Sequence, residues 1–110
     1  MRDGVAILKA VAPDAERLFD ICRRRRVRKL ELFGSASRGE LDPSSGDLDF
    51  LVVFNELSPG EYANNYFGLL DDLQNLFHRP IDLLMTEAIT NPYFLENIAP
   101  ERIELYEDRN

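Results

Sequence analysis

Three aspartates stand at the starts of two apolar segments. Asp47 and Asp49 lie at the start of the apolar run Leu48–Phe54, and Asp82 is the third residue of the segment 80–85. Because side chains alternate between faces along a strand, Asp47 and Asp49 are expected to point the same way. An isolated buried carboxylate is very costly, and neighbouring carboxylates repel one another. The arrangement therefore predicts a bound divalent cation.

Magnesium is the cation that these residues favour. Mg²⁺ takes hard oxygen ligands and commonly binds one or two carboxylates together with substrate phosphates. Three carboxylates, from Asp47, Asp49 and Asp82, can hold two such ions, which is the arrangement for in-line phosphoryl or nucleotidyl transfer. The three aspartates are therefore predicted to be both metal ligands and catalytic residues.

A turn that precedes these acids is suited to bind phosphate. Gly34 and Ser35 follow the apolar segment 29–33 and are expected at the start of a short helix. Glycine lets the backbone approach a phosphate closely, and the free N–H groups of a helix N-terminus favour an anion. The Ser35 hydroxyl and the Arg38 guanidinium can add hydrogen bonds to phosphate oxygens. Neither G-K-[ST] nor G-x-G-x-x-G is present, so this is not a Walker or dinucleotide-binding turn.

Each of these residues alone also has a structural interpretation. Gly34 and Ser35 by themselves are typical of an ordinary strand-to-helix turn, and Asp47 can cap a loop. Asp82 can accept hydrogen bonds from backbone donors. His78, the single histidine, is predicted to be a solvated helix cap rather than a catalyst. The functional interpretation therefore depends on the whole set of residues and their spacing.

The first predicted helix opens at Pro13 and Asp14. Its apolar face, at helical spacing, is formed by Ala15, Leu18, Phe19 and Cys22. The basic run from Arg23 to Arg28, with Lys29, is predicted to close this helix, where cations complement the helix dipole and stay solvated. A surface for nucleic acid or a partner protein is the less favoured interpretation, because the whole chain is acidic.

Alternation, apolar runs and capping residues predict the remaining elements. Strands are predicted at residues 29–33, Leu48–Phe54, 80–85 and 102–107. The second of these is apolar on both faces, as in a central strand, and the last is expected at an edge. Helices are predicted at Pro59–Phe77, begun by a capping box of Ser58 and Glu61, and at 91–98. This order predicts an α/β fold, with a single mixed sheet of about four strands flanked by helices, in one domain over residues 1–110.

Composition limits the classes of function. The chain has 110 residues, an apolar share of 45% that suits a folded domain, and a net charge of -7 that argues against stable nucleic-acid or membrane-surface binding. Cys22 is the only cysteine, so no internal disulfide is possible. No apolar run is long enough for a transmembrane helix, and no signal peptide is recognised. A cytoplasmic protein is expected.

The motifs resemble those of a known family. The order Gly34-Ser35-x-x-Arg38-Gly39, then Gly46-Asp47-Leu48-Asp49, then Asp82 in a strand, is similar to the minimal nucleotidyltransferases, the MNT-type members of the polymerase-beta superfamily. The usual family pattern is G-S-x-A-R-G, then S-D-h-D before an apolar strand, where h is apolar. The resemblance covers nearly the whole chain. Ser37 replaces the preferred alanine, and Gly46 replaces a common serine and so lacks one hydroxyl that could contact phosphate or metal.

The resemblance implies a polymerase-beta-like nucleotidyltransferase fold and a role for each motif residue. The turn Gly34-Ser35, assisted by Arg38, would hold the β- and γ-phosphates of ATP. Asp47 and Asp49 would ligate two Mg²⁺ ions. Asp82 would complete the second metal site and help the acceptor hydroxyl attack the α-phosphorus, so that pyrophosphate leaves.

The resemblance also implies an acceptor. Single domains similar to this chain are often paired with an all-helical HEPN-type ribonuclease toxin, which they silence by transferring AMP from ATP to a tyrosine hydroxyl. Two alternatives stay open: a nucleotidyltransferase acting on a small-molecule hydroxyl such as that of an aminoglycoside, and a non-catalytic, nucleotide-binding antitoxin acting by contact.

Overall fold

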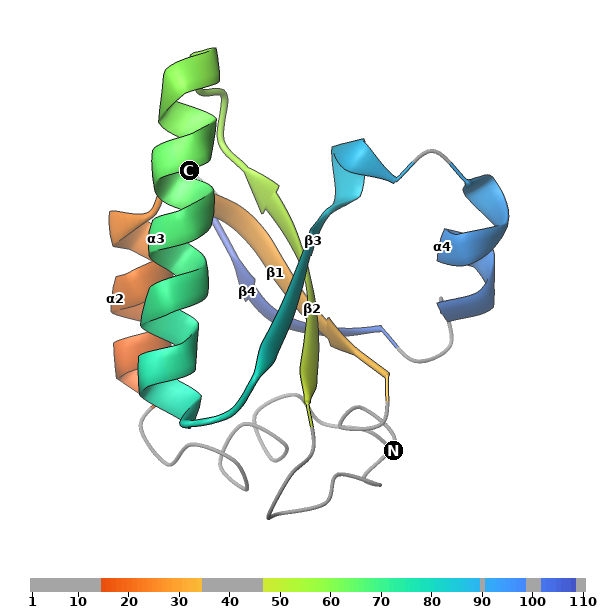
Figure 1. The fold of residues 1–110 in the computed structure, drawn as a ribbon, viewed down its shortest axis with the longest axis horizontal. Coiled ribbons are helices and arrows are strands. Elements are labelled where there is room, and N and C mark those ends of the chain that lie inside the picture. The colour runs from red at the N-terminus through yellow and green to blue at the C-terminus, as the bar shows by residue number, and fades with distance from the viewer. Residues whose placement is uncertain (1–14, 35–46, 90, 99–101, 109–110) are drawn as a thin grey trace.

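The computed structural model describes residues 15–34, 47–89, 91–98 and 102–108 (Figure 1). The elements along the chain are α2 (Ala15–Arg24), β1 (Val27–Phe33), β2 (Leu48–Phe54), α3 (Pro59–Phe77), β3 (Ile81–Met85), the 3-10 helix η2 (Thr86–Ala88), α4 (Pro92–Ile98) and β4 (Ile103–Glu107). Helices α2 and α3 lie side by side against one face of the sheet, and α4 lies on the other side. None of the helices in the described part of the chain is long and apolar enough to cross a membrane.

The four strands form one mixed sheet in the order β3-β2-β1-β4. Strand β1 is antiparallel to both β2 and β4, whereas β2 and β3 are parallel. The sequence-based prediction of a four-stranded mixed sheet flanked by helices is confirmed. So are the central position of β2 and the edge position of β4.

The main core lies between the sheet and the two paired helices. Alternate residues of β2, among them Phe50 and Val52, contact α2 and α3 through Leu18, Leu69 and Leu73, and all five side chains are fully or almost fully buried. The opposite face of β2 is also covered, because Leu51 is buried. Burial on both faces explains why β2 is apolar at successive positions rather than at every second one.

The two ends of α3 are those that the sequence predicts. At its start, the Glu61 carboxylate accepts hydrogen bonds from the hydroxyl of Ser58 (2.7 Å) and from its N–H (3.1 Å). These two bonds hold the pKa of Glu61 below its usual value. At the other end, His78 is exposed, has a φ of 57°, and donates its N–H to the Gln74 carbonyl. His78 is therefore a helix cap, as predicted.

The basic run is where the predicted boundaries are wrong. Helix α2 ends at Arg24 rather than continuing to Lys29, and the strand predicted to begin at Lys29 begins at Val27. Arg26 has a φ of 60°, which ends the helix, and its carbonyl accepts the N–H of Asn55. The reason is burial, because Val27 is 1% exposed and enters the core only as part of the sheet.

Four arginines of this run pair with acids of the same chain. Arg23 pairs with Asp20 in α2. Arg24 and Arg25 both reach Asp72 of α3, at 3.5 and 2.7 Å, and the Arg26 guanidinium lies 2.9 Å from the Glu61 carboxylate. These ion pairs, which the sequence did not predict, favour the solvated-surface interpretation of the run over a surface for nucleic acid or a partner protein.

Two smaller predictions differ from the structure or fall outside it. Pro80 precedes β3 instead of opening it, and the 3-10 turn η2, which directly follows β3, was not predicted. The short helix expected after Gly34 lies outside the described residues.

Candidate active site

All four strands have an end at one end of the sheet. These are the C-terminal end of β1 and the N-terminal ends of β2, β3 and β4. The register pairs Asp49 with Phe33 of β1 and with Asp82 of β3. Neighbouring strands lie about 4.8 Å apart, and directly paired residues point to the same face. The sheet therefore places the carboxylates of Asp49 and Asp82 side by side.

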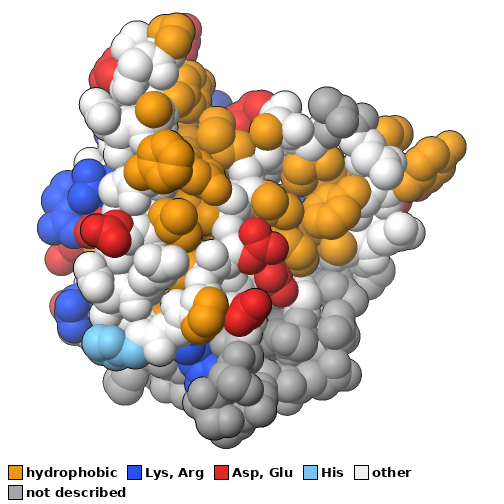
Figure 2. Space-filling model, in the orientation of Figure 1, with side chains coloured by type: hydrophobic (Ala, Val, Ile, Leu, Met, Phe, Trp, Pro, Cys, Tyr) orange, Lys and Arg blue, Asp and Glu red, His pale blue; other side chains and the backbone are white. Residues whose placement is uncertain are grey.

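These two carboxylates point away from helices α2 and α3. Phe50 and Leu83, the next residues of the two strands, belong to the core under those helices. By alternation, Asp49 and Asp82 face the other side of the sheet. Asp49 is half-buried and Asp82 is exposed, while Asp47 directly precedes β2 and is exposed. Figure 2 shows acidic side chains gathered in the middle of that view, between apolar surfaces over α3 and near α4.

Gly34 lies against the Asp49 carboxylate. Its φ is +77°, a conformation that side-chain-bearing residues rarely adopt. A Cβ at this position would overlap with Oδ2 of Asp49. Glycine is thus required twice, by the turn and by the close approach of a carboxylate. This contact joins the turn predicted to bind phosphate to an aspartate predicted to bind metal.

The other predicted phosphate-binding residues are not part of this geometry. Ser35 and Arg38 lie outside the described residues, as do Ser37 and Gly46, where the chain departs from the family pattern. Their roles stay predictions.

The acidic residues suit a cation whose remaining ligands come from a substrate. In the described part of the chain, no group of three or more histidine, cysteine, aspartate or glutamate side chains is close enough to hold a metal ion. The neighbouring Asp49 and Asp82 still supply two hard carboxylates on adjacent strands. Mg²⁺ is commonly held by one or two carboxylates, with water and substrate phosphates completing its octahedron. The donor set fits that mode of binding.

A further acid on the same face, Glu31, is already paired with an arginine. Glu31 of β1, two residues before Phe33, is 7% exposed. Arg102, just before β4, binds its carboxylate with two nitrogens, at 2.6 and 3.2 Å. Glu31 is therefore engaged within the protein rather than available to a cation. This pair was not predicted from the sequence, although an acid inside an apolar strand is a signal for a buried partner.

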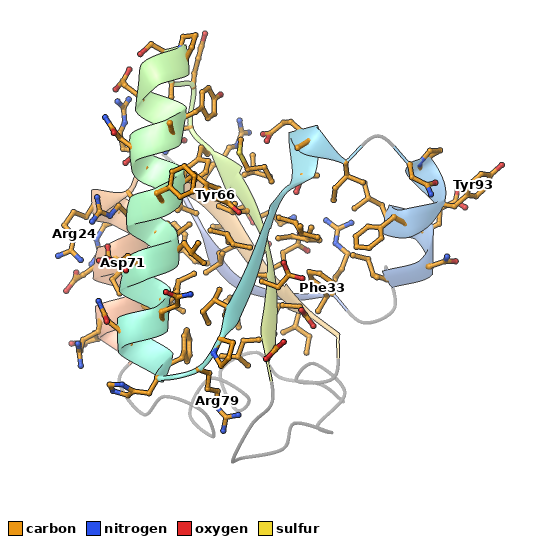
Figure 3. The ribbon with its side chains drawn as sticks, viewed as in Figure 1. Arg24, Phe33, Tyr66, Asp71, Arg79 and Tyr93 are labelled. Carbon is orange, nitrogen blue, oxygen red and sulfur yellow. The ribbon has the colours of Figure 1, made fainter. Side chains whose placement is uncertain are left out.

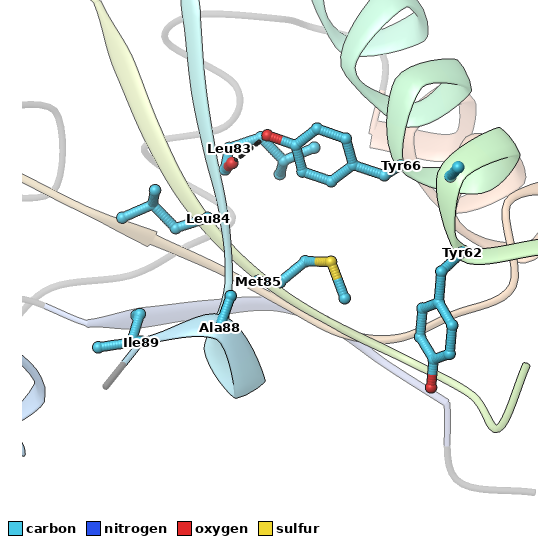
Figure 4. A pocket seen from close by; sticks show the side chains of 8 residues that line it. Tyr62, Tyr66, Leu83, Leu84, Met85, Ala88 and Ile89 are labelled. Atoms are coloured by element: carbon cyan, nitrogen blue, oxygen red, sulfur yellow. Dashed lines mark hydrogen bonds between the residues drawn. The ribbon is translucent and has the colours of Figure 1, made fainter. Parts of the chain in front are cut away.

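An apolar pocket adjoins the strand that carries Asp82. It encloses about 380 Å³ between α3, β3 and η2 (Figure 4) and is lined by Tyr62, Ala63, Tyr66, Leu83, Leu84, Met85, Ala88 and Ile89. Figure 3 shows Tyr66 reaching from α3 toward the sheet, whereas Arg24 and Asp71 lie on the outer side of the helices. Tyr62 and Tyr66 are half-buried and contact the core. The pocket was not predicted from the sequence.

Comparison with known proteins identifies the family. The sequence model of the nucleotidyltransferase domain matches residues 15–105. The chain belongs to the nucleotidyltransferase domain family. A relative from Methanocaldococcus jannaschii, provisionally described as a protein adenylyltransferase, is 36% identical over 78 residues, which are 71% of this chain and 76% of the relative. This nucleotidyltransferase is accordingly an enzyme of the minimal, MNT type.

Solved structures share the fold. One that is provisionally described as a minimal nucleotidyltransferase is 26% identical, with a TM-score of 0.62, and the alignment covers 90% of this chain and 93% of that one. A toxin–antitoxin complex with AMP-PNP has a TM-score of 0.65 at 17% identity, covering 87% and 75% of the two chains. A complex of a tri-AMPylated Shewanella oneidensis HEPN toxin with its MNT antitoxin has a TM-score of 0.58 at 15% identity, covering 86% and 71%. At these last two identities the likeness establishes the fold alone.

Proposed function

We propose that this nucleotidyltransferase uses Mg²⁺ and transfers AMP from ATP to a tyrosine hydroxyl of a partner protein of the HEPN toxin type. The observation that carries the proposal is the register that sets Asp49 beside Asp82, with Gly34 against the Asp49 carboxylate. It joins two acids and the turn predicted to bind phosphate at one end of the sheet.

Each residue would have a defined task in the transfer. Gly34, with Ser35 and Arg38, would bind the β- and γ-phosphates and so orient the α-phosphorus. Asp49 and Asp82 would ligate Mg²⁺, with Asp47 as the third ligand that the family resemblance implies; the ion, when bound, supplies charge stabilisation at the transferred phosphoryl group. The acceptor oxygen forms a bond to the α-phosphorus, the bond to pyrophosphate breaks, and the hydroxyl proton is released. Asp82, which is exposed on the edge strand, would orient that hydroxyl.

Support for a protein acceptor comes from relatives. The M. jannaschii relative is described as acting on protein. Two of the similar folds come from toxin–antitoxin complexes, one with AMP-PNP and one with an AMPylated HEPN toxin. A small-molecule acceptor, or inhibition of the partner by contact alone, would each give a different result in a labelling experiment.

The test measures transfer to a candidate partner directly. The purified protein is incubated with α-labelled ATP, MgCl₂ and the product of the neighbouring gene, and label on that product is identified by mass spectrometry. We expect an AMP ester on a tyrosine, lost in Asp49→Asn. Asp71→Asn is the matched control, since Asp71 is an exposed aspartate on the outer side of α3. It should transfer at the wild-type rate.

The outcomes separate the three functions. If an added aminoglycoside is labelled and the protein is not, the acceptor is a small molecule rather than a protein tyrosine. An Asp49→Asn variant that still neutralises the partner fully would show that contact, rather than transfer, is the mechanism.

A further inference from the structure

Strand β3, which carries Asp82, is held by only one neighbouring strand in the described sheet. It lies at the end of the order β3-β2-β1-β4 and pairs with β2 alone. An edge strand has one row of backbone groups without strand partners. The position of Asp82 therefore depends on whatever else holds the outer side of β3.

Leu83 presents its carbonyl to that outer side. At the start of the pairing, the Leu48 N–H donates to the Pro80 carbonyl (3.1 Å). In a parallel pair, every second residue of a strand bonds to the same neighbour. Pro80, Asp82 and Leu84 therefore bond toward β2, and the N–H and carbonyl of Leu83 point to the free edge. The residue after Asp82 needs a partner from outside the sheet.

Tyr66 of α3 provides that partner. Its hydroxyl donates a 2.6 Å hydrogen bond to the Leu83 carbonyl (Figure 4). The bond lies beside the apolar pocket, and Met85 and Ile89 are among the side chains that line this pocket. In such surroundings a carbonyl without a partner is costly, so the bond strongly favours one position of β3. Asp82 is thereby held by β2 on one side and, one residue later, by Tyr66 on the other.

We propose that Tyr66 is a positioning residue for the metal site: through the Leu83 carbonyl it holds the backbone of β3 where the Asp82 carboxylate stands beside that of Asp49. The inference rests on the proposed function, because it assumes that these two acids bind Mg²⁺. It assigns the Tyr66 hydroxyl a task beyond packing α3 on the sheet. Leu83 contributes only backbone to this contact, so Tyr66 is the side chain to vary.

The test removes the hydroxyl and keeps the ring. Tyr66→Phe is compared with wild type by Mn²⁺ binding, followed by electron paramagnetic resonance with a non-hydrolysable ATP analogue present, and by thermal melting. We expect the Kd for Mn²⁺ to rise about threefold to tenfold, the range covered by the loss of one neutral hydrogen bond. The half-saturating Mg²⁺ concentration for AMP transfer should rise by the same factor.

A matched variant on the same helix separates this role from packing. Tyr62→Phe removes a hydroxyl one turn earlier, at a residue that lines the same pocket, and should leave the Kd for Mn²⁺ unchanged. If Tyr66→Phe lowers the melting temperature but binds Mn²⁺ as tightly as wild type, Tyr66 is a packing residue only and the inference is wrong.

A double mutant tests whether the effect passes through Asp82. In an Asp82→Asn background, Tyr66→Phe should change the Kd for Mn²⁺ no further, because the carboxylate that it positions is gone. An undiminished effect in that background would overturn the inference. Failure of the proposed function itself is distinguishable. If the two acids bind no metal, wild-type protein binds no Mn²⁺ with the nucleotide analogue, whatever residue 66 is; if only the acceptor differs, Mn²⁺ binding and its dependence on Tyr66 are unchanged.

Discussion

Gly34→Ala is the sharpest test of the candidate site, because two independent costs coincide at this residue. Its φ of +77° is unfavourable for alanine by about 1–2 kcal/mol. The new methyl group would also overlap with the Asp49 carboxylate, and forcing extra carbon into filled space costs about 1–3 kcal/mol. The sum, about 2–5 kcal/mol, corresponds to a melting temperature lower by about 8–20 °C for a domain of this size.

The consequence for function should exceed the consequence for stability. To admit the methyl group, the Asp49 carboxylate must move away from Gly34, and so change its place relative to Asp82. We expect Mn²⁺ binding and AMP transfer to be lost at a temperature where the variant is still folded. Circular dichroism melts, Mn²⁺ binding and the labelled-ATP assay measure the three effects on the same preparation.

Two further variants make this prediction refutable. Gly60→Ala is the matched control, because a Cβ there meets nothing within 4 Å, and it should be neutral or stabilising by up to about 1 kcal/mol. In an Asp49→Ala background the overlap is gone, so Gly34→Ala should cost only the backbone term of about 1–2 kcal/mol. If Gly34→Ala has the melting temperature of the wild type and transfers AMP at the wild-type rate, the close contact between Gly34 and Asp49 is not a feature of the active protein.

Three other changes have defined outcomes. Arg102→Met should destabilise the protein by about 1–3 kcal/mol in urea unfolding, since it leaves the buried Glu31 carboxylate without its partner; an unchanged midpoint would contradict this. Burial raises the pKa of the Cys22 thiol to about 12, so the native state keeps a proton that the unfolded state loses near pH 8.5. The free energy of unfolding should therefore fall by about 1.4 kcal/mol per pH unit above about pH 9, relative to Cys22→Ala; parallel pH profiles for the two proteins would refute it. Gly68→Ala should displace the Arg25 guanidinium, which occupies the space of the new methyl group, so its melting temperature should be lower than that of Gly60→Ala; equal melting temperatures of the two variants would contradict this.

Local patterns were sufficient for the elements whose signals agree with one another. Helix α3 begins and ends where Ser58, Glu61 and His78 predict, because capping residues and the apolar stripe point to the same boundaries. The limits of β2 also match, since a continuous apolar run between polar residues is typical of a buried central strand. The predicted boundaries in the basic run were wrong because arginines suit either the end of a helix or the start of a strand. Burial of Val27 decided between them.

The sequence by itself determined the chemistry available to this protein. The types and spacing of Gly34, Asp47, Asp49 and Asp82 indicate a phosphate-binding turn and hard metal ligands, because alternation along one strand depends only on local geometry. The family assignment followed from the same residues and was confirmed by comparison.

Only the tertiary structure decided which of these residues meet. The parallel register that sets Asp49 beside Asp82, the contact of Gly34 with the Asp49 carboxylate, and the bond from Tyr66 to the Leu83 carbonyl join segments far apart in the chain. The salt bridge of Glu31 and Arg102 is of the same kind. Such contacts depend on how whole elements dock to bury their apolar faces, which no local pattern encodes.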